Sequence, residues 1–201
     1  MTTPAAQHVV GSTQSISPRP RLWLRVGVRT GLAAQGAATA AGAALLATAG
    51  GWLQLGAGLR ETALVLGLLI VYLDTHAACH YLVGRPLGIG FRGFGLRGTD
   101  HPELYPPGLR QVMSVLPMWV ALTEPTSRRA ASRFALAAMY AAGETATTVC
   151  TVGAAGAAAA AHAPWGLGAL WVVAVFSAAS SVVVAVIPKG DYAKARHALR
   201  G

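Results

Sequence analysis

An aspartate and two histidines interrupt an otherwise apolar stretch of the chain, LDTHAACHYLVG, which runs from Leu73 to Gly84. His76 and His80 are four residues apart, so on a helix they lie on one face. Two imidazoles at this spacing can bind one metal ion. Ionisable residues inside an apolar span are costly and commonly mark a functional site. The spacing therefore predicts a metal site, with hydrogen-bonded packing histidines as the alternative.

A metal site needs a third protein ligand, and Asp191 is the candidate. It follows the last apolar segment of the chain, three residues beyond Pro188. In the topology predicted below, the helix that carries His80 and the last apolar helix end on the same side of the membrane. We therefore expect Asp191 to complete the site. The alternative is a solvated acid beside Lys189 and Lys194.

The elements that would position these residues are long apolar segments. Of the 201 residues, 54% are hydrophobic and only 11% are charged, which is too apolar for an ordinary soluble domain. We expect an all-α membrane protein with about four transmembrane helices, at residues 31–59, 62–83, 134–161 and 167–187. The apolar stretch 111–122 is too short to cross and contains Pro117, so a half-helix or re-entrant element is expected there.

The basic residues predict how these helices are oriented. With both termini on the inner side, every Lys and Arg except Arg60 falls on that side, as the positive-inside rule requires. The expected organisation is a polar and basic tail at 1–29, a single transmembrane domain at 30–188 and a basic cytoplasmic tail at 189–201. We expect a multi-pass protein of the plasma membrane. A cleaved signal peptide is the alternative for the first apolar segment.

The net charge of +9 does not indicate a nucleic-acid-binding protein. The basic residues flank the apolar segments and do not form a patch interleaved with aromatic residues. The expected partner is therefore the lipid bilayer, and any protein partner or substrate would itself be a transmembrane protein.

The segment HAACHYLVGRPLGIGFRGFGLRG, His76–Gly98, resembles the site-2 protease family of intramembrane zinc metalloproteases. In that family an HExxH motif on a span is followed by Leu/Val, Arg, Leu-Gly and a β-like stretch. Two further segments occur in the family's order. AAGETATT, Ala141–Thr148, stands where members have Ala-Gly-Pro, and VIPKGDYAKA, Val186–Ala195, stands where members have the aspartate that is the third zinc ligand.

The resemblance implies that His76, His80 and Asp191 bind zinc. The chain departs from the family pattern at three positions. Ala77 stands where members have the catalytic glutamate, Glu144 where they have the proline after Ala-Gly, and Tyr192 where they have the glycine after the aspartate. The glutamate moves the protons of peptide hydrolysis, and alanine cannot. We therefore expect a non-proteolytic or degenerate relative that retains the metal.

Two other acids could supply the missing base, and they are the candidate catalytic residues. Asp74 precedes Ala77 by one helical turn, and Glu144 lies within the helix expected at 134–161. If either acts as base, the protein is an active intramembrane zinc peptidase. Otherwise Asp74 would orient a histidine ring, and Glu144 would be a fourth ligand or a hydrogen-bond acceptor. A third hypothesis is a metal-free membrane bundle that uses these polar residues as a proton or ligand pathway.

Overall fold

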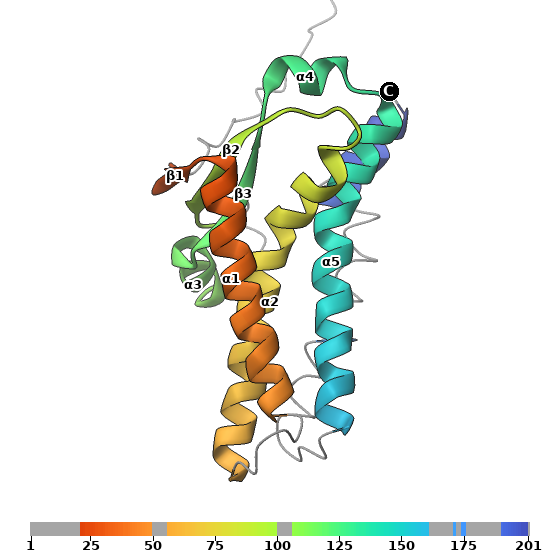
Figure 1. Cartoon of the computed structure of the whole chain (residues 1–201). Coiled ribbons are helices and arrows are strands. Elements are labelled where there is room, and N and C mark those ends of the chain that lie inside the picture. Colours follow the sequence, from red (N-terminus) through yellow and green to blue (C-terminus); the bar gives the residue numbers. More distant parts are fainter. Residues whose placement is uncertain are drawn as a thin grey trace, which may run out of the picture.

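The computed structural model describes residues 21–49, 56–99, 106–160 and 190–200, together with Trp171, Ala174 and Val175. Long helices form a bundle, and a small antiparallel sheet lies at one end of it (Figure 1). The long helices are α1 (Val28–Ala47), α2 (Ala57–Gly84) and α5 (Arg133–Ala160). The shorter elements are β1 (Leu24–Val26), β2 (Phe91–Arg97), α3 (Leu109–Val115), β3 (Met118–Thr123), α4 (Pro125–Ala130) and α7 (Asp191–Arg200).

The helices α1 and α2 pack closely because each has a glycine where the backbone of the other passes. A Cβ atom on Gly42 would lie 2.9 Å from the carbonyl oxygen of Gly67, and a Cβ on Gly67 would lie 2.8 Å from that of Gly42. Small residues on facing helices allow the two backbones to approach in this way. The contact is reciprocal, so it fixes both the spacing and the register of α2 on α1.

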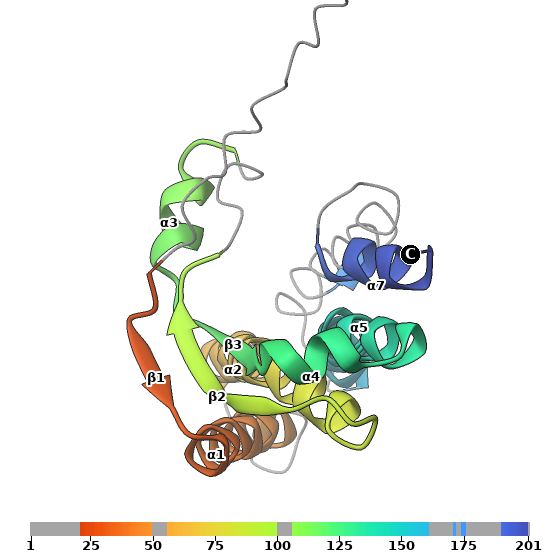
Figure 2. The ribbon, with the colours of Figure 1, turned by 90° about the horizontal axis from the view of Figure 1, so that it is seen from above.

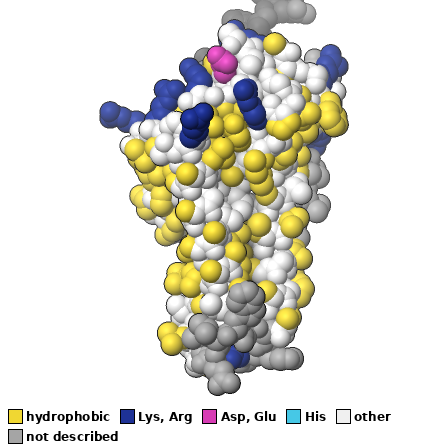
Figure 3. All heavy atoms as spheres, in the orientation of Figure 1, with side chains coloured by type: hydrophobic (Ala, Val, Ile, Leu, Met, Phe, Trp, Pro, Cys, Tyr) yellow, Lys and Arg dark blue, Asp and Glu magenta, His cyan; other side chains and the backbone are white. Residues whose placement is uncertain are grey.

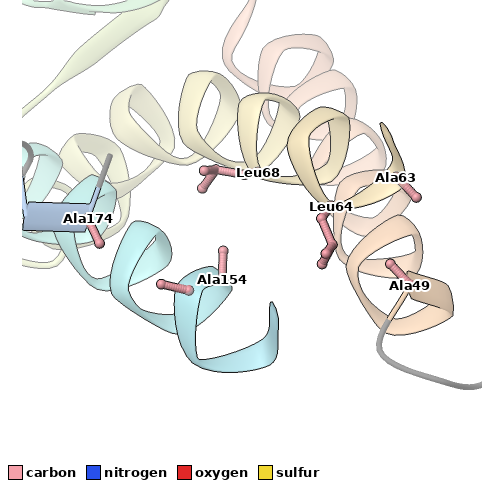
Figure 4. Packing of buried hydrophobic residues seen from close by; sticks show 7 residues of the cluster. Ala49, Ala63, Leu64, Leu68, Ala154 and Ala174 are labelled. Atoms are coloured by element: carbon pink, nitrogen blue, oxygen red, sulfur yellow. The ribbon is translucent and has the colours of Figure 1, made fainter. Parts of the chain in front are cut away.

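The helix α2 also packs against α5, and part of this contact shares a buried cluster with α1. Far from the sheet, the buried core brings Ala154 and Ala155 of α5 against Leu64 and Leu68 of α2 (Figure 4). Nearer the sheet, Met139 of α5 belongs to a second buried cluster with Ile89 and Ala135. Alanine faces let the two helices lie close together, so the backbone of α5 comes near the turn of α2 that carries the histidines.

The sheet has the order β1-β2-β3, and both pairs of strands are antiparallel. Phe94 of the central strand pairs with Val26 on one side and with Ala121 on the other, and its side chain is fully buried. This side chain packs on Gly31 of α1, where a Cβ would overlap the ring. The sheet is therefore seated on the first turns of α1, and β2 begins shortly after the end of α2.

The prediction of an all-α protein with four transmembrane helices is wrong. Among the described residues, α2 is the single helix that is long and apolar enough to cross a membrane, and the chain also forms a three-stranded sheet. The helices α1 and α5 are rich in Ala, Gly and Thr, whose side chains supply little apolar area. The N-in, C-in topology depended on four spans and is withdrawn with them. The fourth expected span, 167–187, lies outside the described residues except for Trp171, Ala174 and Val175.

The expected half-helix at 111–122 is also wrong, because this stretch divides into two elements. α3 ends at Val115, and Leu116 is extended with ψ 120° before Pro117. Proline cannot continue a helix and disfavours the helical conformation at the preceding residue. The chain then enters β3, which is an edge strand. Parts of the two expected tails are ordered as well, since β1 lies within 1–29 and α7 lies within 189–201.

Candidate metal centre

The two histidines of α2 and the aspartate of α7 meet at one point. Nε2 of His76 and Nε2 of His80 lie 3.0 and 3.1 Å from Oδ2 of Asp191, and the two nitrogens are 3.2 Å apart. Ligand atoms bound to a tetrahedral zinc ion at about 2.0–2.1 Å lie about 3.3 Å from one another. The three atoms thus form a triangle with nearly the dimensions of one face of that tetrahedron. These three residues are the group in the described part of the chain that could hold a metal ion.

The second ring nitrogen of His80 is fixed by the backbone of α5. Nδ1 of His80 lies 2.6 Å from the carbonyl oxygen of Met139, so Nδ1 donates the hydrogen bond. In the neutral imidazole, Nε2 then carries a lone pair that is directed at Oδ2 of Asp191. Two lone pairs would face each other at 3.1 Å unless a proton or a cation lay between them. Metal-ligating histidines characteristically donate their other ring nitrogen to a carbonyl or carboxylate in this way.

The third ligand is positioned by the start of α7, which lies beside α5 (Figure 2). Gly190 has φ 88°, a left-handed conformation that glycine adopts readily, and Asp191 is the next residue and the first of the helix. The hydroxyl groups of Tyr192 and Thr145 are 2.9 Å apart, which joins α7 to α5. Nζ of Lys194 lies 2.7 Å from Oδ1 of Asp191 and 5.7 Å from the centre of the Tyr140 ring.

The environment of Asp191 keeps its carboxyl group ionised. Burial alone would raise its pKa, but hydrogen bonds with His76 and His80 and the charges of His80 and Lys194 outweigh burial and lower the pKa well below its ordinary value. Lys194 binds Oδ1, which leaves Oδ2 directed at the two imidazoles. Asp191 is therefore held in the charged form, which is the form that binds a metal.

Gly143 of α5 lies directly against the two imidazoles. A Cβ atom at this position would lie 2.5 Å from Nε2 of His80 and 2.9 Å from Nε2 of His76. Any side chain at Gly143 would therefore occupy the space immediately next to both ligand nitrogens. Glycine at this position therefore lets both imidazoles pack directly against the backbone of α5.

Asp74 does not approach the two histidines. Its Oδ1 accepts a hydrogen bond of 2.8 Å from Nε1 of Trp119 in β3, which directs the carboxylate toward the sheet. Asp74 is two residues from His76, so the two side chains leave the helix in different directions. Among the described residues, no hydrogen bond joins Asp74 to an imidazole. Its observed contact anchors α2 to the sheet.

Glu144 lies close enough to the centre to interact electrostatically with His76, His80 and Asp191. It follows Gly143 on α5, and its side chain is partly buried. The hydroxyl groups of Thr147 and Thr148 donate hydrogen bonds to its backbone carbonyl and not to its carboxylate. Glu144 is thus an acid beside the metal centre, and it is not one of the three residues that converge there.

The sequence predicts the three residues that converge, but it does not predict the residues that support them. The carbonyl of Met139 leaves no signature in a sequence, because every residue has one. Gly143 stands in the segment AAGETATT, directly before Glu144, which was the residue of that segment considered for a catalytic role. The available signal was the glycine itself, four residues after Met139 and so on the same face of α5. Lys194 was named only in the alternative of a solvated acid, and its ion pair with Asp191 follows from their i, i+3 spacing.

Comparison with protein-family models, with characterised proteins and with solved structures finds no match to this chain.

Proposed function

We propose that this protein is a membrane-associated metal-binding protein that holds zinc through His76, His80 and Asp191. The observation that carries the proposal is the convergence of three ligand atoms at 3.0–3.2 Å from residues that are as much as 115 positions apart. In a cluster without a metal, Nε2 of His80 needs a proton of its own to face Oδ2 of Asp191, because Nδ1 is already bonded to Met139. A cation satisfies all three atoms at once.

Zinc is the metal we infer, because two imidazole nitrogens and one carboxylate oxygen form a typical zinc ligand set. Catalytic zinc sites use three protein ligands and keep one position open, whereas structural sites use four. When bound, zinc supplies Lewis acidity at that open position. The resemblance of His76–Gly98 to site-2 proteases favours the same metal. Membrane association is supported by α2, whose length and composition suit a membrane span.

The protein is proposed to be non-proteolytic. The residue after His76, where site-2 proteases have their catalytic glutamate, is Ala77, and it is fully buried. Asp74, the nearest acid on the same helix, is engaged by Trp119. General acid–base catalysis typically contributes about 10²–10⁴-fold to a rate. A centre without that contribution would bind metal and hydrolyse peptides poorly.

The metal content of the purified protein tests the proposal. The detergent-solubilised full chain, loaded with zinc and dialysed, is expected to retain one zinc ion per chain by elemental analysis. His76→Ala and Asp191→Ala should each lose it. His197→Ala is the matched control, because His197 is an exposed histidine of α7 outside the cluster. Protein that retains no zinc after loading, or variants that retain as much as the unaltered chain, would reject the proposal.

A second candidate function is zinc-dependent peptide hydrolysis with Glu144 as the base. It is favoured by the electrostatic interaction of Glu144 with all three ligands from the neighbouring helix. If this candidate is correct, the zinc-loaded protein cleaves a transmembrane peptide in detergent, and Glu144→Gln reduces the rate by about 10²-fold or more while zinc content is unchanged. Activity that survives Glu144→Gln, or zinc-loaded protein that cleaves no peptide, counts against it.

A further inference from the structure

The helix α3 carries an apolar stripe that faces away from the molecule. Leu109, Val112 and Val115 are 44%, 54% and 69% exposed, and no residue of this helix is buried. They are spaced three residues apart, so their side chains follow one side of the helix. A short helix in water is normally stabilised by burying such a stripe. Here the stripe is left outside the fold.

The fold holds α3 through backbone contacts and not through its apolar side. The amide of Thr99 donates a hydrogen bond of 3.1 Å to the carbonyl of Met113. Gly98 packs directly on the carbonyl of Ser114, so closely that a Cβ would overlap it. These contacts fix α3 to the end of β2, and they leave Leu109, Val112 and Val115 free to meet another surface.

Two further exposed apolar side chains lie at the same end of the sheet. Trp23 and Leu24 are both exposed, and the amide of Trp23 donates a hydrogen bond to the carbonyl of Leu96. The next residue of β2, Arg97, pairs with Met118, which follows α3 after a two-residue connection. The register of the sheet thus brings Trp23 and Leu24 to the end where α3 is attached. We refer to Leu109, Val112 and Val115 as the α3 surface; Trp23 and Leu24 lie at the adjoining end of the sheet, with side chains on opposite sides of it.

In the described segments that form and adjoin the α3 surface, the charged residues are all basic. Arg21, Arg25 and Arg110 are exposed, and residues 21–26 and 106–115 contain no Asp or Glu. On the face drawn in Figure 3, Lys and Arg side chains gather at the end that carries the sheet, and hydrophobic side chains cover the helices below. A second copy of this chain would bring like charges together. An anionic lipid leaflet offers negative headgroups to the arginines and acyl chains to the apolar stripe.

We propose that the α3 surface inserts at the boundary between headgroups and acyl chains of an anionic leaflet. Tryptophan is enriched at this depth of the bilayer, and arginine side chains reach from it to the phosphates. The arrangement agrees with α2, because its C-terminal end lies at the sheet (Figure 1). A bilayer crossed by α2 would have one surface near α3. The docked helix would hold the sheet, and hence Trp119 and α2, at a fixed depth.

Depth-dependent fluorescence quenching tests this proposal on the full chain. Cys79 and Cys150 are replaced by serine, and an environment-sensitive label is attached at Val112→Cys or, as the matched control, at Ser114→Cys. Ser114 is on the same helix and is also exposed, but it points in a different direction. The protein is reconstituted into vesicles of phosphatidylcholine and phosphatidylglycerol in equal parts, with brominated acyl chains as quencher.

The label at position 112 is expected to be quenched several-fold more strongly than the label at position 114, with emission shifted to the blue. In vesicles of phosphatidylcholine alone, this difference should shrink by at least half. Equal quenching at the two positions would overturn the proposal, and so would a difference that is the same in both kinds of vesicle. A blue shift at position 112 that depends on protein concentration in detergent would instead identify a second copy as the occupant. Zinc content, measured on the same samples, separates this result from the proposed function.

Discussion

Gly143→Ala tests the metal centre directly, because it adds one carbon atom beside the ligands and removes no ligand. The added Cβ would lie 2.5 Å from Nε2 of His80, whereas carbon atoms in good contact lie about 3.5 Å or more from their neighbours. One of the two groups must move by about 1 Å. His80 cannot move freely, since its Nδ1 is bonded to Met139 at 2.6 Å.

The cost of such overpacking is typically about 1–3 kcal/mol. Without metal, His80 can turn away from the new methyl group at the cost of its hydrogen bond to Met139, whereas with metal its Nε2 must also stay at the ligand position. The strain therefore weakens metal binding, and since 1.4 kcal/mol corresponds to a factor of ten, zinc affinity should fall about 10- to 100-fold. Equilibrium competition with a chromophoric zinc chelator in detergent measures this change.

Gly153→Ala is the control on the same helix. A Cβ at Gly153 meets no atom within 4 Å, so the substitution adds no strain. It should leave zinc affinity unchanged and stabilise α5 by up to about 1 kcal/mol, because alanine is the better helix former. If Gly143→Ala binds zinc as tightly as Gly153→Ala while circular dichroism shows both to be folded, the ion does not occupy the space beside Gly143, and the reasoning fails.

Three further outcomes are expected. The pKa of Asp191 is lower in the folded than in the unfolded protein, so the ionised carboxylate stabilises the fold above the ordinary pKa of about 3.9, and this stabilisation is lost as the pH falls below that value. Urea unfolding of the metal-free protein at a series of acidic pH values should show the loss. The Asp191→Asn variant should not show it. Chelation of the metal should increase amide hydrogen exchange in residues 190–200. The reason is that α7 buries only Ala193 and Ala195 and is otherwise held by polar contacts. Unchanged exchange would contradict a role for the metal in holding α7. Gly42→Ala should destabilise the protein by about 1–3 kcal/mol in thermal or urea unfolding, since its Cβ would meet the backbone of α2. The control is Gly36→Ala in the same helix, whose Cβ would meet nothing within 4 Å and which should not destabilise the protein.

The convergence of His76, His80 and Asp191 could be predicted from the sequence because ionisable residues are rare in and next to apolar segments. His76 and His80 are one turn apart on a helix whose predicted limits, 62–83, nearly match the observed Ala57–Gly84. Asp191 was found because it follows the last apolar segment. Asp74 was assigned by helical angle alone, and its observed partner, Trp119, lies in a strand that sequence reasoning did not expect.

The resemblance of His76–Gly98 includes a β-like stretch where β2 lies, but the three-stranded sheet could not be predicted because its strands carry little signal of their own. β2 reads FRGFGLR, and glycine at two inner positions removes the β-branched and aromatic pattern typical of strands. Gly93 has φ 140° and a Cβ there would overlap the carbonyl of Val26, so glycine is required by the neighbouring strand. That requirement arises from pairing between residues more than 60 positions apart. Composition likewise overstated the number of membrane spans, because alanine-rich segments count as hydrophobic whether they face lipid or another helix.

The position of the third ligand in the chain has a consequence for biosynthesis. Asp191 follows His80 by 111 residues, so at translation rates of about 5–20 residues per second the ribosome needs about 5–20 s to reach it after the histidines have been made. During that interval the nascent chain presents only two imidazoles, which hold a cation weakly. For the proposed metal site, tight capture would wait until α7 has been synthesised and has docked, so metal acquisition would be one of the last events in the maturation of the protein.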